Sequence, residues 1–291
     1  MIRRVYRPTT LAELWPLLAD GALVMAGGTD LLVGRRGLPP ADVALLEGVG
    51  ALAEVSEEEG LLRLGAMASH GALAASGLVR SRLPVLTQAL STLGSPPIRA
   101  MGTLGGNIAT ASPAGDSLPP LYALEAQVEL ASKGGRRRMP LCEMLLGPGR
   151  TALLPGEIIV SVLVRPPGAD TVQHFEKVGR RNALAIAVVS LAAVISRDAE
   201  GRVVKARLAV GSAGPTVVRC TAAEAALMGR ALSRDSLLEA GARLREAIKP
   251  VDDVRATAAY RRQVAGNLLL RLAAGECKGK EDGERLRRPG G

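Results

Sequence analysis

Two short stretches, Ala26-Gly27-Gly28-Thr29-Asp30 and Thr103-Leu104-Gly105-Gly106-Asn107, decide how this sequence is interpreted. Each follows an apolar segment and ends in small polar residues. A Gly-Gly step lets backbone N–H groups turn toward a ligand where a Cβ atom would clash, and successive N–H groups that converge on one point bind anions. The stretches lie about 75 residues apart, and together they predict a site for the two phosphates of one dinucleotide.

The common nucleotide-binding signatures do not account for these stretches. The sequence has no G-x-x-x-x-G-K-[ST] motif. Gly48-Val49-Gly50-Ala51-Leu52-Ala53 fits G-x-G-x-x-A, but the next apolar segment, residues 61–65, ends in Ala66-Met67. A Rossmann unit needs an acidic residue at that place. We therefore interpret residues 48–53 as a turn into a short helix.

No standard catalytic set is present, and the sequence predicts no catalytic residue. It lacks G-x-S-x-G, and neither His70 nor His174 has the context of a catalytic base. His70 is expected to open a helix, and His174 is expected to lie in a strand. The carboxylates of residues 57–59 are interpreted as a hydrophilic hairpin tip.

Cysteine usage argues against a bound metal. The three cysteines, Cys142, Cys220 and Cys277, are far apart and form no C-x-x-C pair. An iron–sulfur cluster or structural zinc needs about four ligands that usually cluster in sequence. We expect neither a metal site nor a disulfide framework.

The composition suggests a folded protein with an excess of positive charge. The chain has 291 residues and a formal net charge of +9. The charge is spread along the sequence, and only five residues are aromatic, so platforms for stacking nucleic-acid bases are scarce. We expect no nucleic-acid partner, and assign the charge to an acidic partner surface or to solubility.

Nothing in the sequence indicates export or membrane insertion. The N-terminus has no apolar signal region. No apolar stretch reaches the ~18 residues of a membrane span. The expected location is the cytoplasm.

Patterning divides the chain into two expected domains, with Pro166-Pro167-Gly168 at the boundary. The first covers residues 1–168, with subdomains at about 1–56 and 57–168. The second, residues 169–275, has expected strands followed by expected helices, which indicates an α+β fold. Residues 276–291 are expected to be a disordered tail.

The second glycine stretch continues as a run of glycines and small polar residues from Thr103 to Asp116. Hydroxyl and amide groups in such a run can donate hydrogen bonds to phosphate and ribose, and Asp116 can accept one from a ribose hydroxyl. A compact Ω-loop with a purely structural role is the alternative that spacing leaves open. Residues 98–108 are glycine-rich and are expected to form a loop.

Both stretches, in this order, resemble the FAD-binding medium subunit of the molybdenum hydroxylases, the family of carbon monoxide dehydrogenases and xanthine dehydrogenases. The resemblance covers about residues 2–275. It is also carried by Tyr6-Arg7-Pro8-Thr9-Thr10-Leu11, Leu62-Arg63-Leu64-Gly65-Ala66, Ile98-Arg99, Leu154-Pro155-Gly156-Glu157-Ile158-Ile159, Phe175-Glu176-Lys177, Arg181 and the segment from Asp253 to Arg262.

The resemblance implies a fold and a set of cofactor contacts. The fold is an N-terminal FAD-binding domain of the PCMH, or vanillyl-alcohol-oxidase, type with two subdomains. A smaller α+β domain of the carbon monoxide dehydrogenase flavoprotein type follows. The implied FAD contacts are Ala26, Gly27, Gly28, Thr29, Asp30 and Leu31 on one side of the diphosphate, Thr103, Gly105, Gly106 and Asn107 on the other, Thr110 and Asp116 at the ribityl or adenosine part, and Ile159 and Lys177 near the isoalloxazine.

The sequence departs from the family pattern near Arg181. The family often has an acidic residue after the basic pair there, whereas this chain has Asn182-Ala183-Leu184-Ala185. The scarcity of aromatic residues leaves no candidate for stacking on the flavin.

The resemblance also implies a role in electron transfer. Substrate is oxidised at a molybdopterin centre on a large partner subunit, and electrons reach this FAD through [2Fe-2S] clusters on a small partner subunit. The flavin then passes them to an external acceptor, and the expected assembly is a dimer of heterotrimers. The alternatives are a free-standing FAD oxidase or reductase of the same fold and a cofactor-free scaffold subunit.

Overall fold

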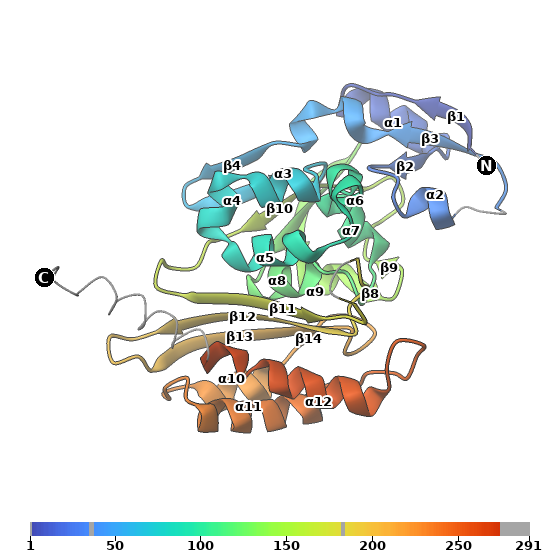
Figure 1. Ribbon diagram of the computed structural model, residues 1–291. Coiled ribbons are helices and arrows are strands. Elements are labelled where there is room, and N and C mark those ends of the chain that lie inside the picture. The colour runs from blue at the N-terminus through green and yellow to red at the C-terminus, as the bar shows by residue number, and fades with distance from the viewer. Residues whose placement is uncertain (1, 35–37, 182–183, 274–291) are drawn as a thin grey trace, which may run out of the picture.

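The computed structural model describes residues 2–34, 38–181 and 184–273, and shows sheets and helices stacked along the molecule (Figure 1). A small parallel sheet lies at one end, a five-stranded sheet with helices lies in the middle, and a four-stranded sheet with three helices closes the other end. The predicted disordered tail at 276–291 lies outside the described residues. Within the described ranges, no helix is both long and apolar enough to cross a membrane.

The first sheet has the order β1-β3-β2, with β1 (Ile2–Tyr6), β3 (Ala41–Leu45) and β2 (Leu23–Met25) all parallel. Helix α1 (Leu11–Ala19) begins after Thr10, whose hydroxyl accepts a hydrogen bond from the Glu13 N–H. The Glu13 carboxylate in turn accepts from the Thr9 N–H at 2.8 Å. This reciprocal cap fixes the start of α1. Strand β2 leads directly into the first glycine stretch, which α2 (Leu31–Gly34) follows.

The segment that fits G-x-G-x-x-A forms two single 3₁₀ turns, η1 (Leu46–Gly48) and η2 (Gly50–Leu52). The interpretation as a turn into a short helix is confirmed. Strand β4 (Val55–Glu58) then pairs with β5 (Leu61–Gly65) as an antiparallel hairpin. The carboxylates at 57–59 lie at the tip of this hairpin, as predicted.

The middle sheet is antiparallel, in the order β4-β5-β10-β6-β7, with β10 (Ile158–Val164) at its centre beside β6 (Gln127–Ser132) and β7 (Gly135–Pro140). Leu62, Leu64, Val128, Leu130 and Val162 are buried in one core with the helices between β5 and β6. Those helices are α3 (His70–Ala75), α4 (Gly77–Arg82), α5 (Pro84–Thr92), α6 (Pro96–Met101), α7 (Leu104–Thr110) and α8 (Leu118–Ala123), and a short helix and hairpin follow β7: α9 (Leu141–Met144), β8 (Leu145–Gly147) and β9 (Arg150–Thr151).

The expectation that residues 98–108 form a loop is wrong. They belong largely to α6 and α7, whose first turns are capped by the hydroxyls of Ser95 and Thr103. Glycine and proline lower helix propensity, but tertiary packing overrides it here. Leu104 and Ile108 of α7 are fully buried, and that burial stabilises the helix.

The last sheet has the order β11-β12-β13-β14, formed by β11 (Val172–Val178), β12 (Val189–Arg197), β13 (Val203–Gly211) and β14 (Val218–Arg219). Successive residues of a strand point to opposite faces, and β12 shows this alternation. Ala192 and Val194 belong to the core shared with the middle of the molecule, whereas Leu191, Ala193 and Ile195 belong to a separate core.

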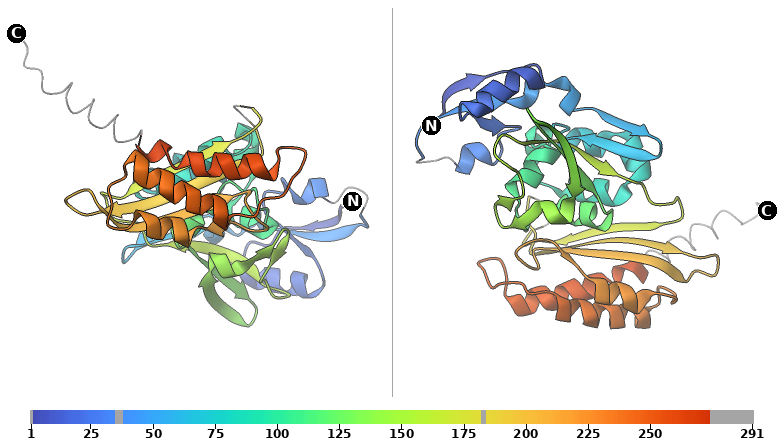
Figure 2. Two further views of the ribbon diagram at one scale, coloured as in Figure 1. Left: turned by 90° about the horizontal axis from the view of Figure 1, so that it is seen from below. Right: turned by 180° about the vertical axis from the view of Figure 1, so that it is seen from behind.

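That separate core lies under α10 (Thr221–Leu227), α11 (Arg234–Ala247) and α12 (Ala258–Leu268), which cover the outer face of the sheet (Figure 2). Helices α5 and α8 contact the inner face. The predicted order of strands followed by helices is therefore confirmed. Arg261 on α12 is 2% exposed and donates to the Val188 carbonyl and to Asp253 at 2.6 Å each, which fastens α12 to the sheet.

Candidate functional site

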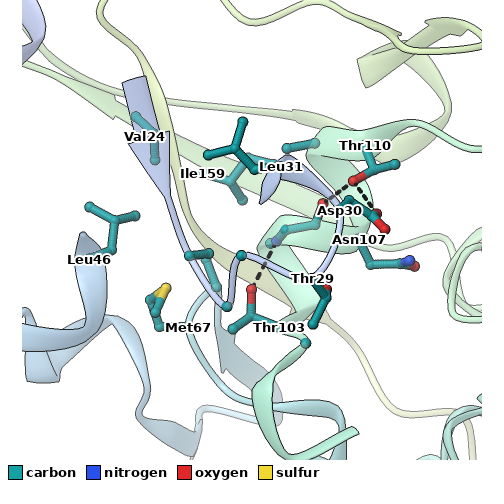
Figure 3. A pocket seen from close by; sticks show the side chains of 18 of the residues that line it. Val24, Thr29, Asp30, Leu31, Leu46, Met67, Thr103, Asn107, Thr110 and Ile159 are labelled. Carbon is teal, nitrogen blue, oxygen red and sulfur yellow. Dashed lines mark hydrogen bonds between the residues drawn. The ribbon is translucent and has the colours of Figure 1, made fainter. Parts of the chain in front are cut away.

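A cavity of about 500 Å³ lies where the small parallel sheet meets the helices of the middle layer (Figure 3). The loop after β2 forms one wall, the start of α7 forms another, and the ends of β5 and β10 close it. Val24, Leu46, Met67 and Ile159 give it apolar surface. The site thus joins segments that are up to 135 residues apart in sequence, from Val24 to Ile159.

All of the predicted cofactor contacts except Asp116 and Lys177 line this cavity. The two glycine stretches face each other across it, as the sequence predicts. The predicted residues at its surface are Ala26, Gly27, Gly28, Thr29, Asp30, Leu31, Thr103, Gly105, Gly106, Asn107, Thr110 and Ile159.

The first glycine stretch keeps its backbone donors free. In the described structure, the N–H groups of Gly27, Gly28, Thr29 and Asp30 donate to no protein acceptor. Gly28 has a φ of +70°, which favours glycine, and a Cβ on Gly27 would lie 1.7 Å from the Met101 carbonyl oxygen. The loop therefore packs against the backbone that precedes α7 while its donors stay available for an anion.

The second glycine stretch is different, because its donors are already used. The Leu104 and Gly105 N–H groups donate to the Ala68 and Ala66 carbonyls at 3.1 and 2.8 Å. The Gly106 N–H donates to the Thr103 hydroxyl at 3.1 Å. The prediction of an anion nest is wrong for Leu104 and Gly105, since these groups hold α7 against the end of β5.

A side-chain contact joins the two stretches. The Thr110 hydroxyl lies 2.8 Å from Asp30 Oδ2 and 3.0 Å from the Gly106 carbonyl (Figure 3). Asn107 Oδ1 accepts a hydrogen bond from the Ser117 hydroxyl at 2.6 Å. That contact orients the Asn107 side chain and leaves its amide NH₂ group as a donor.

Sequence reasoning missed about half of the lining residues. Among the described residues of the lining, the acidic ones are Asp30 and Glu157, and no lysine or arginine is present. Several missed residues lie in segments that carried the family resemblance, so their positions could have been found from it. The missed residues are Val24, Leu46, Ala66, Met67, His70, Leu93, Ile98, Gly102, Ala109, Leu153, Glu157 and Ile158.

The Glu157 carboxylate is held by hydrogen bonds from other groups of the protein. It accepts two hydrogen bonds from Arg137 at 2.7 Å each and one from the Leu154 N–H at 2.8 Å. The Arg137 hydrogen bond is the main reason that the pKa of Glu157 lies below its ordinary value. The carboxylate therefore stays ionised and fixes the turn that leads into β10.

Asp116 and Lys177 form a buried ion pair outside the cavity lining. Lys177 Nζ lies 2.6 Å from Asp116 Oδ2, with side-chain exposures of 7% and 8%, and donates to the Thr92 carbonyl at 2.8 Å. Burial raises the pKa of Asp116, an effect that the charge of Lys177 opposes. Lys177 also borders a second pocket, of about 390 Å³, with Thr92, Val178, Gly179, Arg181, Leu184 and Ala185.

The cavity's chemistry suits an anionic dinucleotide. Free backbone donors lie on one wall, hydroxyl and amide groups lie on the other, and apolar surface completes the lining. Within the described ranges, no group of three or more His, Cys, Asp or Glu side chains could hold a metal ion.

Comparison with known proteins gives the family. Residues 1–166 match the model of the FAD binding domain in molybdopterin dehydrogenase, and residues 173–274 match that of the CO dehydrogenase flavoprotein C-terminal domain. The chain belongs to the family of FAD-binding subunits of molybdenum hydroxylases. It is an oxidoreductase subunit, and its cofactor is FAD.

Relatives in this family match over nearly their whole length. The chain is 32% identical to the 6-hydroxypseudooxynicotine dehydrogenase complex subunit alpha of Paenarthrobacter nicotinovorans, covering 89% of this chain and 88% of the relative. It is 28% identical to the carbon monoxide dehydrogenase medium chain of Hydrogenophaga pseudoflava, covering 91% of this chain and 94% of the relative.

Solved structures of the family share the fold. A carbon monoxide dehydrogenase structure from Hydrogenophaga pseudoflava matches with a TM-score of 0.88 and 30% identity, covering 93% of this chain and 96% of the matched chain. Quinoline 2-oxidoreductase from Pseudomonas putida 86 matches with a TM-score of 0.89 and 27% identity, covering 96% and 98%. The fold expected from the sequence, an FAD-binding domain followed by an α+β domain, is confirmed.

Proposed function

We propose that this chain takes electrons from [2Fe-2S] clusters on a small partner subunit and passes them, through FAD, to an external acceptor. Substrate oxidation takes place at a molybdopterin centre on a large partner subunit. The observation that carries this proposal is the cavity between the two glycine stretches, whose described lining offers free backbone donors, hydroxyl groups and an amide for a dinucleotide. Relatives that this chain matches over 88% and 94% of their length bear the names of a complex subunit and of a medium chain, which supports a shared assembly.

In this proposal the chain supplies binding and orientation. The free N–H groups of residues 27–30 hold the FAD diphosphate, with Ala26 and Leu31 flanking them. The opposite wall supplies Thr103, Gly105, Gly106, Asn107 and Thr110. When bound, FAD supplies the redox chemistry, as cofactors generally do.

Three residues remain predicted contacts for other parts of the cofactor. Ile159 lies in the cavity wall and is assigned to the isoalloxazine side. Lys177 and Asp116, which lie outside the cavity lining, are assigned to the flavin and to the ribityl or adenosine part. A lysine charge near the isoalloxazine would stabilise the reduced, anionic form of the flavin. Thr92 of the second pocket and Leu93 of the cavity are consecutive residues, so the two hollows are neighbours.

We also propose the finer organisation. The FAD-binding domain spans residues 1–168, with subdomains at about 1–56 and 57–168, and the C-terminal domain spans residues 169–275. The assembly is a dimer of heterotrimers in the cytoplasm.

The proposal is tested by the cofactor content of the assembly. A tagged chain isolated from its native host should contain FAD in a one-to-one ratio with the chain, together with iron and molybdenum from co-purifying subunits. Absorbance spectra and elemental analysis measure these contents. A chain that oxidises a substrate by itself, without iron or molybdenum, would instead be a free-standing flavoenzyme. A chain that retains no FAD would be a scaffold.

The position of FAD is tested by glycine variants. Gly28→Val introduces a branched side chain at a φ of +70°, and Gly106→Val places a Cβ atom 2.9 Å from the Thr103 hydroxyl. Both should lose FAD, as judged by flavin absorbance after gel filtration. Gly77→Val is the matched control, because a Cβ there meets no atom within 4 Å. Near-normal FAD content in both variants would contradict the proposed position of FAD between the two glycine stretches.

A further inference from the structure

One histidine in the described cavity wall has a buried ring nitrogen without a hydrogen-bond partner. His70 is the first residue of α3, is 3% exposed and lines the cavity. Its backbone N–H donates to the Gly102 carbonyl at 2.9 Å, but its Nδ1 atom is buried without a hydrogen-bond partner. Seven side-chain atoms are buried and unpaired in the described structure, and His70 is the only residue among them that lines the cavity. Buried polar atoms are nearly always hydrogen-bonded, so this imidazole lacks a partner that a ligand can supply.

The ring is held in place by its surroundings. A Cβ atom on Gly102 would lie 3.1 Å from His70 Cδ2 and 3.5 Å from Nε2, so glycine at 102 leaves room for the imidazole. Gly102 immediately precedes Thr103, the cap of α7. His70 therefore lies at the point where the second glycine stretch begins.

The described lining around His70 offers little positive charge to a diphosphate. No lysine or arginine is present among the described lining residues, and the two acidic ones are Asp30 and Glu157. His70 is thus the one described lining side chain that can carry a positive charge. A diphosphate held without any counter-charge in a buried site pays a large desolvation cost.

The described elements packed against His70 carry few charged groups. Asp30 faces it from the first glycine stretch, while α3, α5 and α7 carry no other charged side chain. Arg99 on α6 donates to the Leu93 and Gly94 carbonyls, and Arg82 on α4 pairs with Glu57. Arg80, also on α4, is exposed.

We propose that the His70 imidazole donates a hydrogen bond to the FAD diphosphate and takes up a proton when that diphosphate binds. Without ligand, burial lowers the pKa of His70 to about 4, although the charge of Asp30 opposes the shift. An opposite charge at close range raises a histidine pKa by about 1 to 3 units. The inference rests on the proposed position of FAD between the two glycine stretches.

Proton uptake by His70 determines the direction in which FAD affinity changes with pH. A group whose pKa rises on binding makes binding tighter at low pH, and the gain is lost as pH increases through the pKa of the complex. Each unit of increase corresponds to about a tenfold change in affinity. Only part of this gain appears at pH 5.5, which lies close to the pKa of the complex. For an increase of about two units, from about 4 to about 6, we expect FAD to bind about fourfold more tightly at pH 5.5 than at pH 8.

The test is an FAD titration of the apo-protein from pH 5.5 to 8, followed by flavin fluorescence, with three variants. His70→Gln keeps a donor but cannot take up a proton, so it should bind FAD with little pH dependence. His70→Leu should bind weakly at every pH. His174→Gln, the matched control, removes the other histidine of the chain, which lies outside the cavity lining, and should retain the normal pH dependence.

A second readout follows the imidazole directly. In isotope-labelled His174→Gln protein, His70 gives the only histidine side-chain NMR signals. Their titration midpoint should rise by about two pH units when FAD is added. An unchanged midpoint, or a pH dependence in His70→Gln equal to that of the unmodified protein, overturns the role of His70. Neither result affects the position of FAD, which the Gly28→Val and Gly106→Val variants test separately.

Discussion

The two glycine stretches have similar sequences but differ in the hydrogen bonding of their backbone N–H groups. Residues 26–30 form a loop whose N–H groups at 27–30 have no protein acceptor among the described residues, whereas residues 104–106 begin a helix whose N–H groups are already bonded to the protein. In the proposed function, the first stretch binds the FAD diphosphate, and the second forms a wall that supplies side chains. A Gly-Gly pair therefore indicates close approach of a backbone, but not whether a ligand or the protein itself makes that approach.

The glycines within each pair differ as well. Gly27 and Gly105 are in contact with protein backbone, because a Cβ atom would lie 1.7 Å from the Met101 oxygen in one case and 2.9 Å from the Ala66 oxygen in the other. Gly28 has a positive φ, and Gly106 is in contact with the Thr103 side chain. The first glycine of each pair thus allows another backbone segment of the protein to pack closely against it.

The largest effect is expected for Gly27→Val, which forces the first stretch away from the segment that precedes α7. The free energy of unfolding should fall by about 3 kcal/mol, the upper end for overpacking, and FAD should be lost. Urea denaturation and flavin absorbance measure the two effects. Gly77→Val serves as the control, and normal FAD content in Gly27→Val would contradict the close packing of the two stretches.

Gly105→Val should lower the stability of the fold more than it lowers the affinity for FAD. Its Cβ atom would lie 2.7 Å from Ala66 Cβ and disturb the hydrogen bond from the Gly105 N–H to the Ala66 carbonyl. We expect a loss of about 2 kcal/mol in unfolding free energy, with a smaller relative change in FAD affinity of the folded fraction. A variant of normal stability that cannot bind FAD would show that the second stretch binds through its backbone after all.

Thr103→Ala removes the cap of α7. The cost should be about 1 kcal/mol, typical of a lost N-cap, and Thr103→Ser should restore most of it because the hydroxyl returns. Thermal unfolding followed by circular dichroism measures both. Equal melting temperatures for Thr103→Ala and the unmodified protein would show that the hydrogen bond from the Gly106 N–H to the Thr103 hydroxyl does not stabilise α7.

The smallest effect is expected for Thr110→Val, which breaks the contact between the two stretches. Loss of the hydrogen bond to Asp30 should cost about 1 kcal/mol or less and increase FAD dissociation a few-fold. A double-mutant cycle with Asp30→Ala isolates the contact. Fully additive FAD dissociation constants would show that Thr110 and Asp30 act independently.

Sequence patterning predicted the C-terminal half better than the helices of the middle layer. The strands and helices after residue 169 have strong apolar periodicity, and their order was predicted correctly. Helices α6 and α7 were missed because Pro96, Pro97, Gly102, Gly105 and Gly106 are poor helix formers. The capping residues Ser95 and Thr103 were the signals that could have revealed them.

For the site, the sequence by itself determined which segments meet. The order of the two glycine stretches and their neighbours identified the family, its FAD and most of the residues that line one side of the cavity. Such motifs are local, because a glycine at a crowded position cannot be replaced without moving the backbone around it.

Only the tertiary structure decided which donors are free. The carbonyls of Ala66 and Ala68 use the first N–H groups of α7, and those residues come from a strand end some 40 residues earlier in the chain. The same packing buried His70 beside Gly102 and left its Nδ1 atom without a partner among the described residues. The availability of hydrogen-bond donors and the burial of side chains depend on contacts between distant segments, so no local pattern could have shown that the donors of the first stretch stay free in the described structure.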